Sequence, residues 1–481
     1  MGFEVHQPYR LNPAFEPGKV RRGRKHEEAY FSDSNKEILL RVCDKCYIPA
    51  TQLMLELLDD GFKCAYSLSG TLVEQLERWS PDTLDLFRQV ARHRNAEMLS
   101  QTYYHSVASL FDDDLAEFEA QVRLHQRLMK DAFGVETQVV ENTEFIFNNA
   151  IAGSVARMGF RAAYTEGVDR ILGWRSPNYV YSCRGMKVLM RNFPLSDDIA
   201  FRFPNRSWSE WPLTADKYSS WIARSQGDYV NVFVDYETFG EHQWADTGIM
   251  EFLRWLPREC VDRGVAFATP SEIAELEPKG ELRFDETVSW ADVEKDVSAW
   301  LGNTIQHTAL KAVQRARPFA QDKKIWRYLQ TSDHFYYMAS KFGSCGEVHS
   351  YFSPDACTNI EAFDGYMRVL ADFTARSARK MRPRDVAVEL RCLPPEKAFR
   401  FRNPVVYTGF TAYSLDDFGE MLNYVPSDSV AYHIKRGDFA RWIRDVLKDD
   451  SLADEVSECQ NRIELIEVVD RKRKELRRRL K

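Results

Sequence analysis

Short apolar runs alternate with longer stretches of helical periodicity along the first 275 residues. The apolar runs predict strands at residues 3–8, 62–70, 96–103, 137–145, 161–167, 187–192, 229–237 and 265–269. The periodic stretches predict helices at 36–59, 71–93, 113–133, 147–158 and 246–262, with a short helix from Pro270. This alternation favours parallel strands with covering helices, and six to eight such units can close a β/α barrel.

The pattern changes after Pro278, because residues 290–380 carry mostly helical periodicity and few strand signals. Residues 380–397 read as a linker into a further unit. We therefore expect an α/β protein with three parts, which are a β/α-barrel domain at 1–278, a helical bundle at 279–380 and a small α-rich accessory domain at 386–481.

Composition agrees with a folded protein that has a sizeable core, since 44% of the 481 residues are hydrophobic and 13% are aromatic. The net charge of −7 gives no reason to expect a polyanion as the main partner. No apolar run approaches 18 residues, and the N-terminus lacks the pattern of a signal peptide. We expect a cytoplasmic protein without a membrane span.

Nine scattered cysteines suit free thiols in a reducing compartment. Cys43 and Cys46 have zinc-like spacing, but there is no second such pair, and both lie in a helical pattern. We interpret them as buried helix cysteines. The basic run at 471–481 is typical of a solvated helix end, with an acidic partner or a nucleic acid as the alternative.

Polar side chains follow three of the predicted strands, where barrel enzymes keep their active sites. They are His6-Gln7, the run from Glu141 to Glu144, and the run from Asp235 to His242. An unpaired buried carboxylate costs several kcal/mol, so repeated acids at strand ends indicate use in function. Helix capping and surface ion pairs are the alternative interpretation. Two carboxyl groups facing one cleft suggest the acid and nucleophile of glycoside hydrolysis.

Four segments carry a resemblance to a known family, namely FEVHQPYRL, AEMLSQTYYHS, VENTEFIFNN and VFVDYETFGEHQW. They resemble the ordered motifs of glycoside hydrolase family 57, and within it the α-amylase-type branch. The resemblance extends through SWADVEKDVSAWLGN and WRYLQTSDHFYYM to about residue 375. It implies an incomplete seven-stranded β/α barrel followed by a helical domain that completes the cleft.

The resemblance also implies a retaining mechanism on α-linked glucans without a metal or an organic cofactor. The family's nucleophile falls on Glu144 and its acid/base falls on Asp235. His6 matches the histidine beside the glucosyl unit being cleaved, Glu97 the acid of the second motif, and Asp333 and His334 the bundle segment that reaches the substrate. Relatives often have an acid at the position of Gln101, and this difference bears on specificity or on the level of activity and not on the catalytic pair.

Further substrate contacts are expected from the same segments, with core packing as the alternative for the tryptophans. Glu237 leaves the face of Asp235 two residues later and is expected to contact a sugar hydroxyl or support the site. The remaining candidates for substrate binding are Gln7, His242, Trp244 and Trp290.

The expected partner is an α-glucan such as glycogen, starch or maltodextrin, with no membrane and no nucleic acid. A 4-α-glucanotransferase or a branching enzyme would use the same pair, and a non-catalytic glucan-binding protein is a further alternative. A deacetylase-like enzyme would need a metal set, and His6, His105 and His242 do not have a convincing spacing for one. The domain at 386–481 resembles a small domain of unknown function that occurs beside sugar-processing enzymes.

Overall fold

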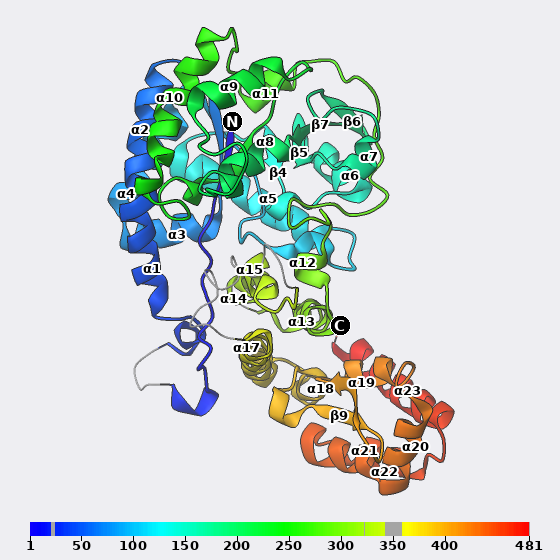
Figure 1. Cartoon of the computed structure of the whole chain (residues 1–481). Helices are drawn as coiled ribbons and strands as arrows, with labels where there is room; N and C mark the ends of the chain where they lie inside the picture. Colours follow the sequence, from blue (N-terminus) through cyan, green and yellow to red (C-terminus); the bar gives the residue numbers. More distant parts are fainter. Residues whose placement is uncertain (21–24, 322, 342–357, 481) are drawn as a thin grey trace.

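The computed structural model describes residues 1–20, 25–321, 323–341 and 358–480. Two four-stranded sheets form the centre of the N-terminal part (Figure 1), in the orders β3-β2-β1-β8 and β4-β5-β7-β6. All pairs are parallel except β6 with β7. The strands are β1 (Gly2–Val5), β2 (Cys64–Leu68), β3 (Ala96–Met98), β4 (Val139–Glu141), β5 (Ala162–Glu166), β6 (Tyr181–Cys183), β7 (Met186–Arg191) and β8 (Phe233–Asp235).

The two sheets are joined at both of their inner margins. A parallel bridge between Ser100 and Val140 connects the end of β3 to β4. On the other side, the backbone N–H of Asn192 donates to the carbonyl of Asn231 at 2.8 Å. Because parallel strands share a direction, their carboxyl ends gather at one edge, which is where the sequence puts its acids.

Amphipathic helices cover the sheets because each strand is buried and needs an apolar partner on its outer face. In α4, for example, Leu84, Phe87 and Val90 recur at helical spacing and are buried. Figure 1 shows α2, α4 and α10 along one side and α6 and α7 on the other. These helices are α1 (Ser34–Val42), α2 (Ile48–Asp59), α3 (Gly70–Trp79), α4 (Pro81–Arg92), α5 (Ala116–Leu128), α6 (Asn149–Arg157), α7 (Asp169–Leu172), α8 (Phe193–Asp197), α9 (Ala215–Arg224), α10 (Ile249–Asp262) and α11 (Pro270–Ile273).

Seven of the eight predicted strands are present, and the prediction of a strand at 265–269 is wrong. That segment makes no backbone ladder, and Val265 and Phe267 pack instead against the hydrophobic core, with the ring of Phe267 4.8 Å from that of Phe62 just before β2. The sequence also did not predict β6, which has only three residues. The predicted helix at 36–59 is α1 and α2 joined by a π-helical turn at Cys43–Tyr47.

The segment after the sheets is helical, as expected for residues 290–380. Its helices are α12 (Ser298–Leu301), α13 (Thr304–Arg315), α14 (Lys323–Tyr328), α15 (Ser332–Tyr336) and α17 (Asn359–Lys380). The start of α15 is fixed to the segment after β3, because Ser106 and Thr331 form an antiparallel bridge and the N–H of Ser332 donates to the carbonyl of His105 at 2.9 Å. This attachment brings a bundle helix to the carboxyl ends of the strands.

The C-terminal unit lies at the foot of the molecule in Figure 1. Its core is built on a short hairpin and contains Phe399, Phe401, Phe418 and Trp442. Its hairpin adds strands to a unit that the sequence predicted only as α-rich. The elements are α18 (Arg384–Leu390), β9 (Phe399–Arg402), β10 (Tyr407–Ala412), α19 (Leu415–Met421), α20 (Ser427–Arg436), α21 (Asp438–Trp442), α22 (Asp450–Glu458) and α23 (Arg462–Leu480).

The basic helix α23 uses much of its charge inside this unit. Lys472 pairs with Asp449 at 2.6 Å, and both Arg473 and Arg477 pair with Asp416 at 3.0 Å. These side chains fix α23 to α19 and to the start of α22. These ion pairs neutralise part of the positive charge of residues 471–481, for which an acidic partner or a nucleic acid was the alternative interpretation.

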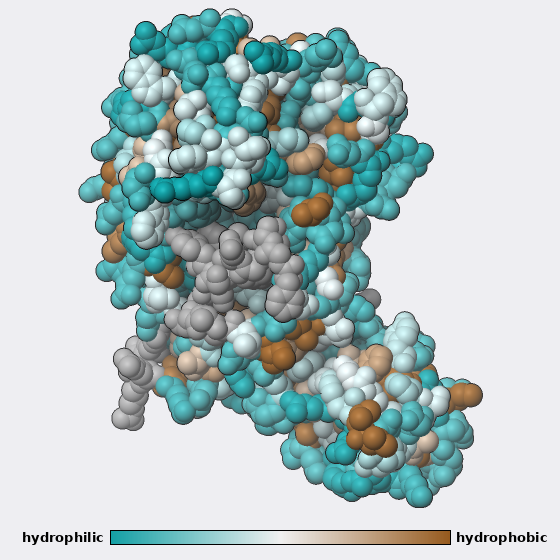
Figure 2. All heavy atoms as spheres, viewed as in Figure 1, coloured by the Kyte–Doolittle hydropathy of each residue, from teal (hydrophilic) through white to brown (hydrophobic). Residues whose placement is uncertain are grey.

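Cys43 and Cys46 are buried in the helical turn, and the Cys46 thiol donates to the carbonyl of Tyr236 at 3.2 Å. They belong to a set of seven buried free cysteines, whereas Cys345 and Cys357 lie outside the described residues. In the part of the chain that the structure describes, no helix is long and apolar enough to cross a membrane. Hydrophilic residues predominate on the face drawn in Figure 2, and apolar ones gather only in small groups.

Candidate active site

Glu144 lies directly after β4, in a short 3-10 turn formed by Thr143–Phe145. The backbone φ of Glu144 is +60°, and that of Phe145 is +56°. Non-glycine residues rarely adopt this left-handed region, and each costs about 1–2 kcal/mol. Two such residues in succession turn the Glu144 side chain in a direction that a regular strand or helix does not give.

Two hydrogen-bond donors and a histidine surround the Glu144 carboxylate, which is 19% exposed. The indole N–H of Trp290 donates to Oε2 at 2.8 Å, and the hydroxyl of Ser332 donates to Oε1 at 2.9 Å. The imidazole Nε2 of His105 lies 3.4 Å from Oε1. A carboxylate held this way is oriented and stabilised as an anion while it keeps a path to solvent.

Asp235 ends β8 and is partly exposed. Desolvation and the charge of Glu144 raise its pKa to about 7, while Arg191 and His105 act in the opposite direction. The ring of Phe145 packs 4.8 Å from that of Phe233, which joins the turn of Glu144 to the strand of Asp235. The two carboxyls are therefore close enough for their charges to interact, and they have different environments.

A buried ion cluster supports the strand ends next to Asp235. Arg191 of β7 donates to Glu166 at 2.9 Å, to Asp197 at 2.7 Å and to the backbone carbonyl of Phe233 at 2.7 Å. Lys295 lies 3.4 Å from Glu166. The guanidinium of Arg191 also lies over the Trp290 ring, 5.6 Å from its centroid. One cation thus fixes both the strand of Asp235 and the indole that bonds Glu144.

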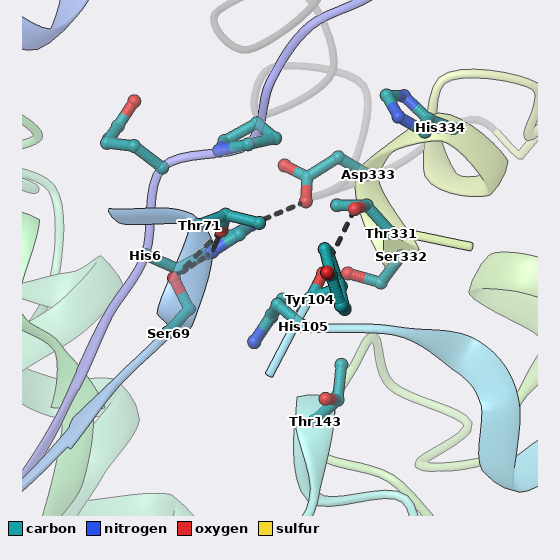
Figure 3. A network of polar contacts seen from close by, with 12 residues as sticks. His6, Ser69, Thr71, Tyr104, His105, Thr143, Thr331, Ser332, Asp333 and His334 are labelled. Carbon is teal, nitrogen blue, oxygen red and sulfur yellow. Dashed lines mark hydrogen bonds and ion pairs between the residues drawn. The ribbon is translucent and has the colours of Figure 1, made fainter. Parts of the chain in front are cut away.

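His6 connects β1 to the bundle. Its Nδ1 lies 2.7 Å from the hydroxyl of Ser69, and its Nε2 lies 3.0 Å from Oδ2 of Asp333 (Figure 3). Burial and His105 lower the pKa of His6 to about 4, so that it is neutral at pH 7. The neutral ring accepts from Ser69, which donates its proton, and donates Nε2–H to Asp333.

His105 packs against His6, with ring centroids 4.0 Å apart and an interplanar angle of 23°. Burial alone would lower the pKa of His105, but Glu4, Glu144 and Asp333 raise it to about 9. In the sequence, His105 is considered only for a metal set whose spacing is not convincing. In the described residues, no group of three or more His, Cys, Asp or Glu side chains is arranged to hold a metal ion.

Gln7 and Glu237 are buried behind this layer. Arg10 donates two bonds to the Gln7 side-chain oxygen, at 3.2 and 3.3 Å, and the Tyr47 hydroxyl donates to the Glu237 carboxylate. Burial and Asp235 raise the pKa of Glu237 to about 8. Their side chains are directed to protein partners, which suits support of the site.

The turn after Asp235 exposes one large ring. Gly240 has a φ of +126°, and an added Cβ would lie 2.0 Å from the carbonyl of Lys45, so only glycine fits this close turn. Trp244 is 57% exposed, with the Lys45 ammonium 4.6 Å from its ring centroid. His242 is partly exposed, and desolvation lowers its pKa to about 4.

The structure does not bring Glu97 or His334 into the cluster. Glu97 pairs in register with Ala65, low on the strands, and its carboxylate accepts from the N–H and hydroxyl of Ser271 at 2.8 and 2.6 Å. His334 lies beyond Asp333 from His6 in Figure 3, and its Nε2 is 3.1 Å from the carbonyl of Tyr328. Asp333, one residue earlier, faces the site.

Several residues at the site were not singled out from the sequence. Two of them, Glu166 and Arg191, end predicted strands, as the selected acids do, and that position was a usable signal. Ser332 adjoins Asp333, and Glu4 lies inside the first strand, where its charged side chain is buried between the apolar neighbours Phe3 and Val5.

A family model described as Glycosyl hydrolase family 57 matches residues 1–287 of the chain. A protein of Methanocaldococcus jannaschii named "Putative alpha-amylase" is 43% identical over 392 residues, which cover 77% of this chain and 83% of that protein.

Two crystal structures share the fold. One is a GH57-type branching enzyme from Pyrococcus horikoshii, with a TM-score of 0.56 and 14% identity over 79% of this chain and 90% of that one. The other is a GH57 branching enzyme from Thermococcus kodakaraensis, with a TM-score of 0.56 and 13% identity over 80% and 90% of the two chains.

Proposed function

Because the chain belongs to glycosyl hydrolase family 57, we propose that it is a retaining, α-amylase-like glycoside hydrolase that cleaves internal bonds of α-linked glucans. Glu144 is the nucleophile and Asp235 is the acid/base. The observation that carries this assignment is the contrast between the two carboxyls. Glu144 is surrounded by donors, whereas desolvation and the charge of Glu144 raise the pKa of Asp235 to about 7.

In the first step, a Glu144 oxygen attacks the anomeric carbon and a carbon–oxygen ester bond forms. The bond from that carbon to the glycosidic oxygen breaks, and Asp235 gives its proton to the departing oxygen. The Asp235 carboxyl must be protonated at the start, which its raised pKa favours.

In the second step, water attacks the same carbon, Asp235 takes the water proton, and the ester bond to Glu144 breaks. Esterified Glu144 has no charge, so its contribution to the raised pKa of Asp235 disappears. Asp235 thus acts as the acid before the intermediate forms. Afterwards its lower pKa favours the ionised form, which acts as the base.

We further propose that the two sheets are the halves of one incomplete barrel with seven parallel strands. Residues 1–278 then form the catalytic domain, residues 279–380 the bundle that completes the cleft, and residues 386–481 an accessory domain. The bonds from His6 to Asp333 and from Ser332 to Glu144 support a cleft that both of the first two parts build.

We assign the substrate contacts by the exposure of each side chain and by whether it faces the catalytic pair. His6, Asp333, Trp290 and His242 line the sugar beside the catalytic pair, and Trp244 stacks on a more distant ring. Gln7 and Glu237 hold these groups from behind. Glu97 and His334 have no contact in this proposal, since both are bonded elsewhere. The substrate is glycogen, starch or maltodextrin, and the seven buried free cysteines support a cytoplasmic location.

Incubation with maltoheptaose tests the activity and its acceptor. Net release of reducing ends at the expense of maltoheptaose is the expected result. Redistributed chain lengths without new reducing ends would make the protein a 4-α-glucanotransferase, and new α-1,6 linkages in the NMR spectrum would make it a branching enzyme.

Glu144→Gln and Asp235→Asn are the matched controls, because each keeps the size of the side chain. Both are expected to lose turnover by several orders of magnitude. A wild-type protein that binds maltoheptaose, glycogen and starch but converts none of them would contradict the enzymatic proposal and leave a glucan-binding protein.

A further inference from the structure

His105 stands between a buried carboxyl of β1 and the proposed nucleophile. Its Nδ1 lies 3.5 Å from Oε1 of Glu4 and its Nε2 lies 3.4 Å from Oε1 of Glu144. Building on the proposed function, we infer that His105 is a positioning residue. As an imidazolium it holds the Glu144 carboxylate in place, with the buried carboxyls of Glu4 and Glu141 behind it.

The hydrogen-bond pattern around Gln101 fixes the proton on Nδ1 of His105. The Ser67 hydroxyl donates to Glu141 at 2.9 Å, so its oxygen is left to accept from the Gln101 amide at 2.8 Å. The same amide nitrogen donates to Glu4 at 2.9 Å. The amide oxygen of Gln101 therefore faces Nδ1 of His105, at 2.9 Å, and an amide oxygen can only accept.

The other ring nitrogen faces a carboxylate oxygen of Glu144, which also accepts only. A proton on Nε2 as well as on Nδ1 gives the charged form of the ring, which pairs with the Glu144 carboxylate 3.4 Å away. Burial lowers the pKa of His105, but Glu4, Glu144 and Asp333 outweigh it and raise the value to about 9. The geometry and the charges thus lead to the same protonation state.

The neutral state of His6, which stacks on His105, agrees with a charged His105. Two imidazolium rings 4.0 Å apart would repel, and His6 has a neutral pattern in which it accepts from Ser69 and donates to Asp333. The titratable groups that act on His105 are Glu4 of β1, the catalytic pair Glu144 and Asp235, His6 after β1, and Asp333 of the bundle, and Glu141 lies next to Glu4.

Behind the imidazolium, Glu4 and Glu141 form a carboxyl pair. Burial first, and then their proximity, raises the pKa of Glu4 well above its usual range, and burial raises that of Glu141 to about 7. An acid at position 101 would place a third carboxyl in this group, and the amide of Gln101 avoids that charge.

During the reaction His105 transfers no proton. It faces the carboxylate that leaves the anomeric carbon in the second step, and its charge stabilises that leaving group and the free nucleophile alike. Loss of this charge is expected to slow turnover, because the nucleophile loses its cationic neighbour. The acid limb of the pH–activity profile is expected to move to higher pH for the same reason.

Nuclear magnetic resonance of ring-labelled histidine tests the protonation state without reference to activity. The His105 signals are assigned with the His105→Gln variant and followed from pH 5 to pH 10. We expect a ring protonated at pH 7 that titrates near pH 9, and a midpoint lower by at least one pH unit in Glu4→Gln. Gln101→Glu should move the midpoint upward.

The matched control is Glu119→Gln, which removes a carboxylate that is bonded to Ser154 of α6 and is not among the groups that shift the pKa of His105, so it should leave the His105 titration unchanged. A His105 ring that is neutral at pH 7 in the wild type, or that does not respond to Glu4→Gln, would overturn the inference. Neither outcome depends on whether the protein cleaves a glucan.

The kinetic arm uses His105→Gln, with circular dichroism to verify folding. We expect kcat on an aryl maltooligosaccharide to fall at least tenfold, and the acid limb of the profile to move up by half a pH unit or more. A uniform loss at all pH values would indicate a structural role and contradict the inferred charge. An inactive wild-type protein would refute the proposed function. The protonation state of His105 would then still be decided by its titration.

Discussion

The indole N–H of Trp290 donates to Oε2 of Glu144 at 2.8 Å, across a sequence separation of 146 residues. The same ring stacks on Phe145, with centroids 4.9 Å apart and an interplanar angle of 10°. One tryptophan from the segment after the sheets thus fixes both the proposed nucleophile and the residue next to it. This relationship ties the catalytic carboxylate to a part of the chain outside the strands.

Trp290→Phe keeps the stacked ring and removes the donor. A hydrogen bond to a charged group contributes about 1.5–3 kcal/mol, so kcat should fall by about tenfold to a hundredfold. The measurement is kcat on an aryl maltooligosaccharide, with thermal unfolding as the check on folding. An unchanged kcat would show that Glu144 does not need this donor.

The pH dependence follows from Asp235. Its pKa is raised to about 7, and the first step needs its protonated form, so kcat/KM should fall as pH rises through about 7. Stopped assays from pH 4 to pH 9 on maltoheptaose measure the profile. The proton donor would be another group if the wild-type kcat/KM profile had no basic limb. The same would hold if Asp235→Glu left the position of that limb unchanged.

Asp333 tests the contribution of the bundle. Asp333→Asn keeps an acceptor for the Nε2–H of His6, whereas Asp333→Ala leaves that donor without its partner. The alanine variant should lose about tenfold to a hundredfold in kcat/KM on maltoheptaose, and the asparagine variant should lose less. Equal values for the alanine variant and the wild type would mean that this bond has no part in the reaction.

His125 makes a stability prediction with a definite sign. It is buried, its Nε2 lies 2.7 Å from the carbonyl of Leu68, and burial lowers its pKa to about 4. Because the unfolded state binds a proton below about pH 6.5 and the folded state does not until about pH 4, the wild type loses stability as pH falls through this window.

His125→Asn lacks this titration. Its deficit in the free energy of unfolding, relative to wild type, should therefore shrink by about 2 kcal/mol between pH 8 and pH 5. Urea titrations followed by tryptophan fluorescence give the two differences. A deficit that grows toward pH 5 would mean that His125 is charged in the folded protein.

The sequence predicted those parts of the site that strand ends and motifs define. Glu144, Asp235 and His6 follow apolar strands, and the periodicity of those strands puts their ends at a common edge. Seven strands were expected in nearly their observed places for the same reason. The segment at 265–269 has the same apolar composition and forms no ladder, since composition does not reveal whether a neighbour is there to pair.

Contacts between distant segments could not be read from the sequence. Glu4 and His105 are 101 positions apart, and only the register of β1 against the neighbouring strands turns the Glu4 side chain inward to meet His105. Glu97 shows the opposite case, because its place low on β3 directs it to Ser271. The helical turn at α15 likewise separates Asp333, which faces the site, from His334, which does not.

The central claim is that Glu144 and Asp235 act on opposite sides of one glycosidic bond. Azide tests it through the configuration of its product, with Glu144→Ala and Asp235→Ala as the pair of enzymes and an activated maltooligosaccharide as substrate. Without the nucleophile, azide attacks the anomeric carbon directly and gives the β-glycosyl azide. Without the acid/base, azide attacks the enzyme ester and gives the α-glycosyl azide.

The deciding measurement is the anomeric proton coupling of the two azide products. We predict the β-azide from Glu144→Ala and the α-azide from Asp235→Ala. The same anomer from both variants, or the reverse assignment, would contradict the roles given to these two residues.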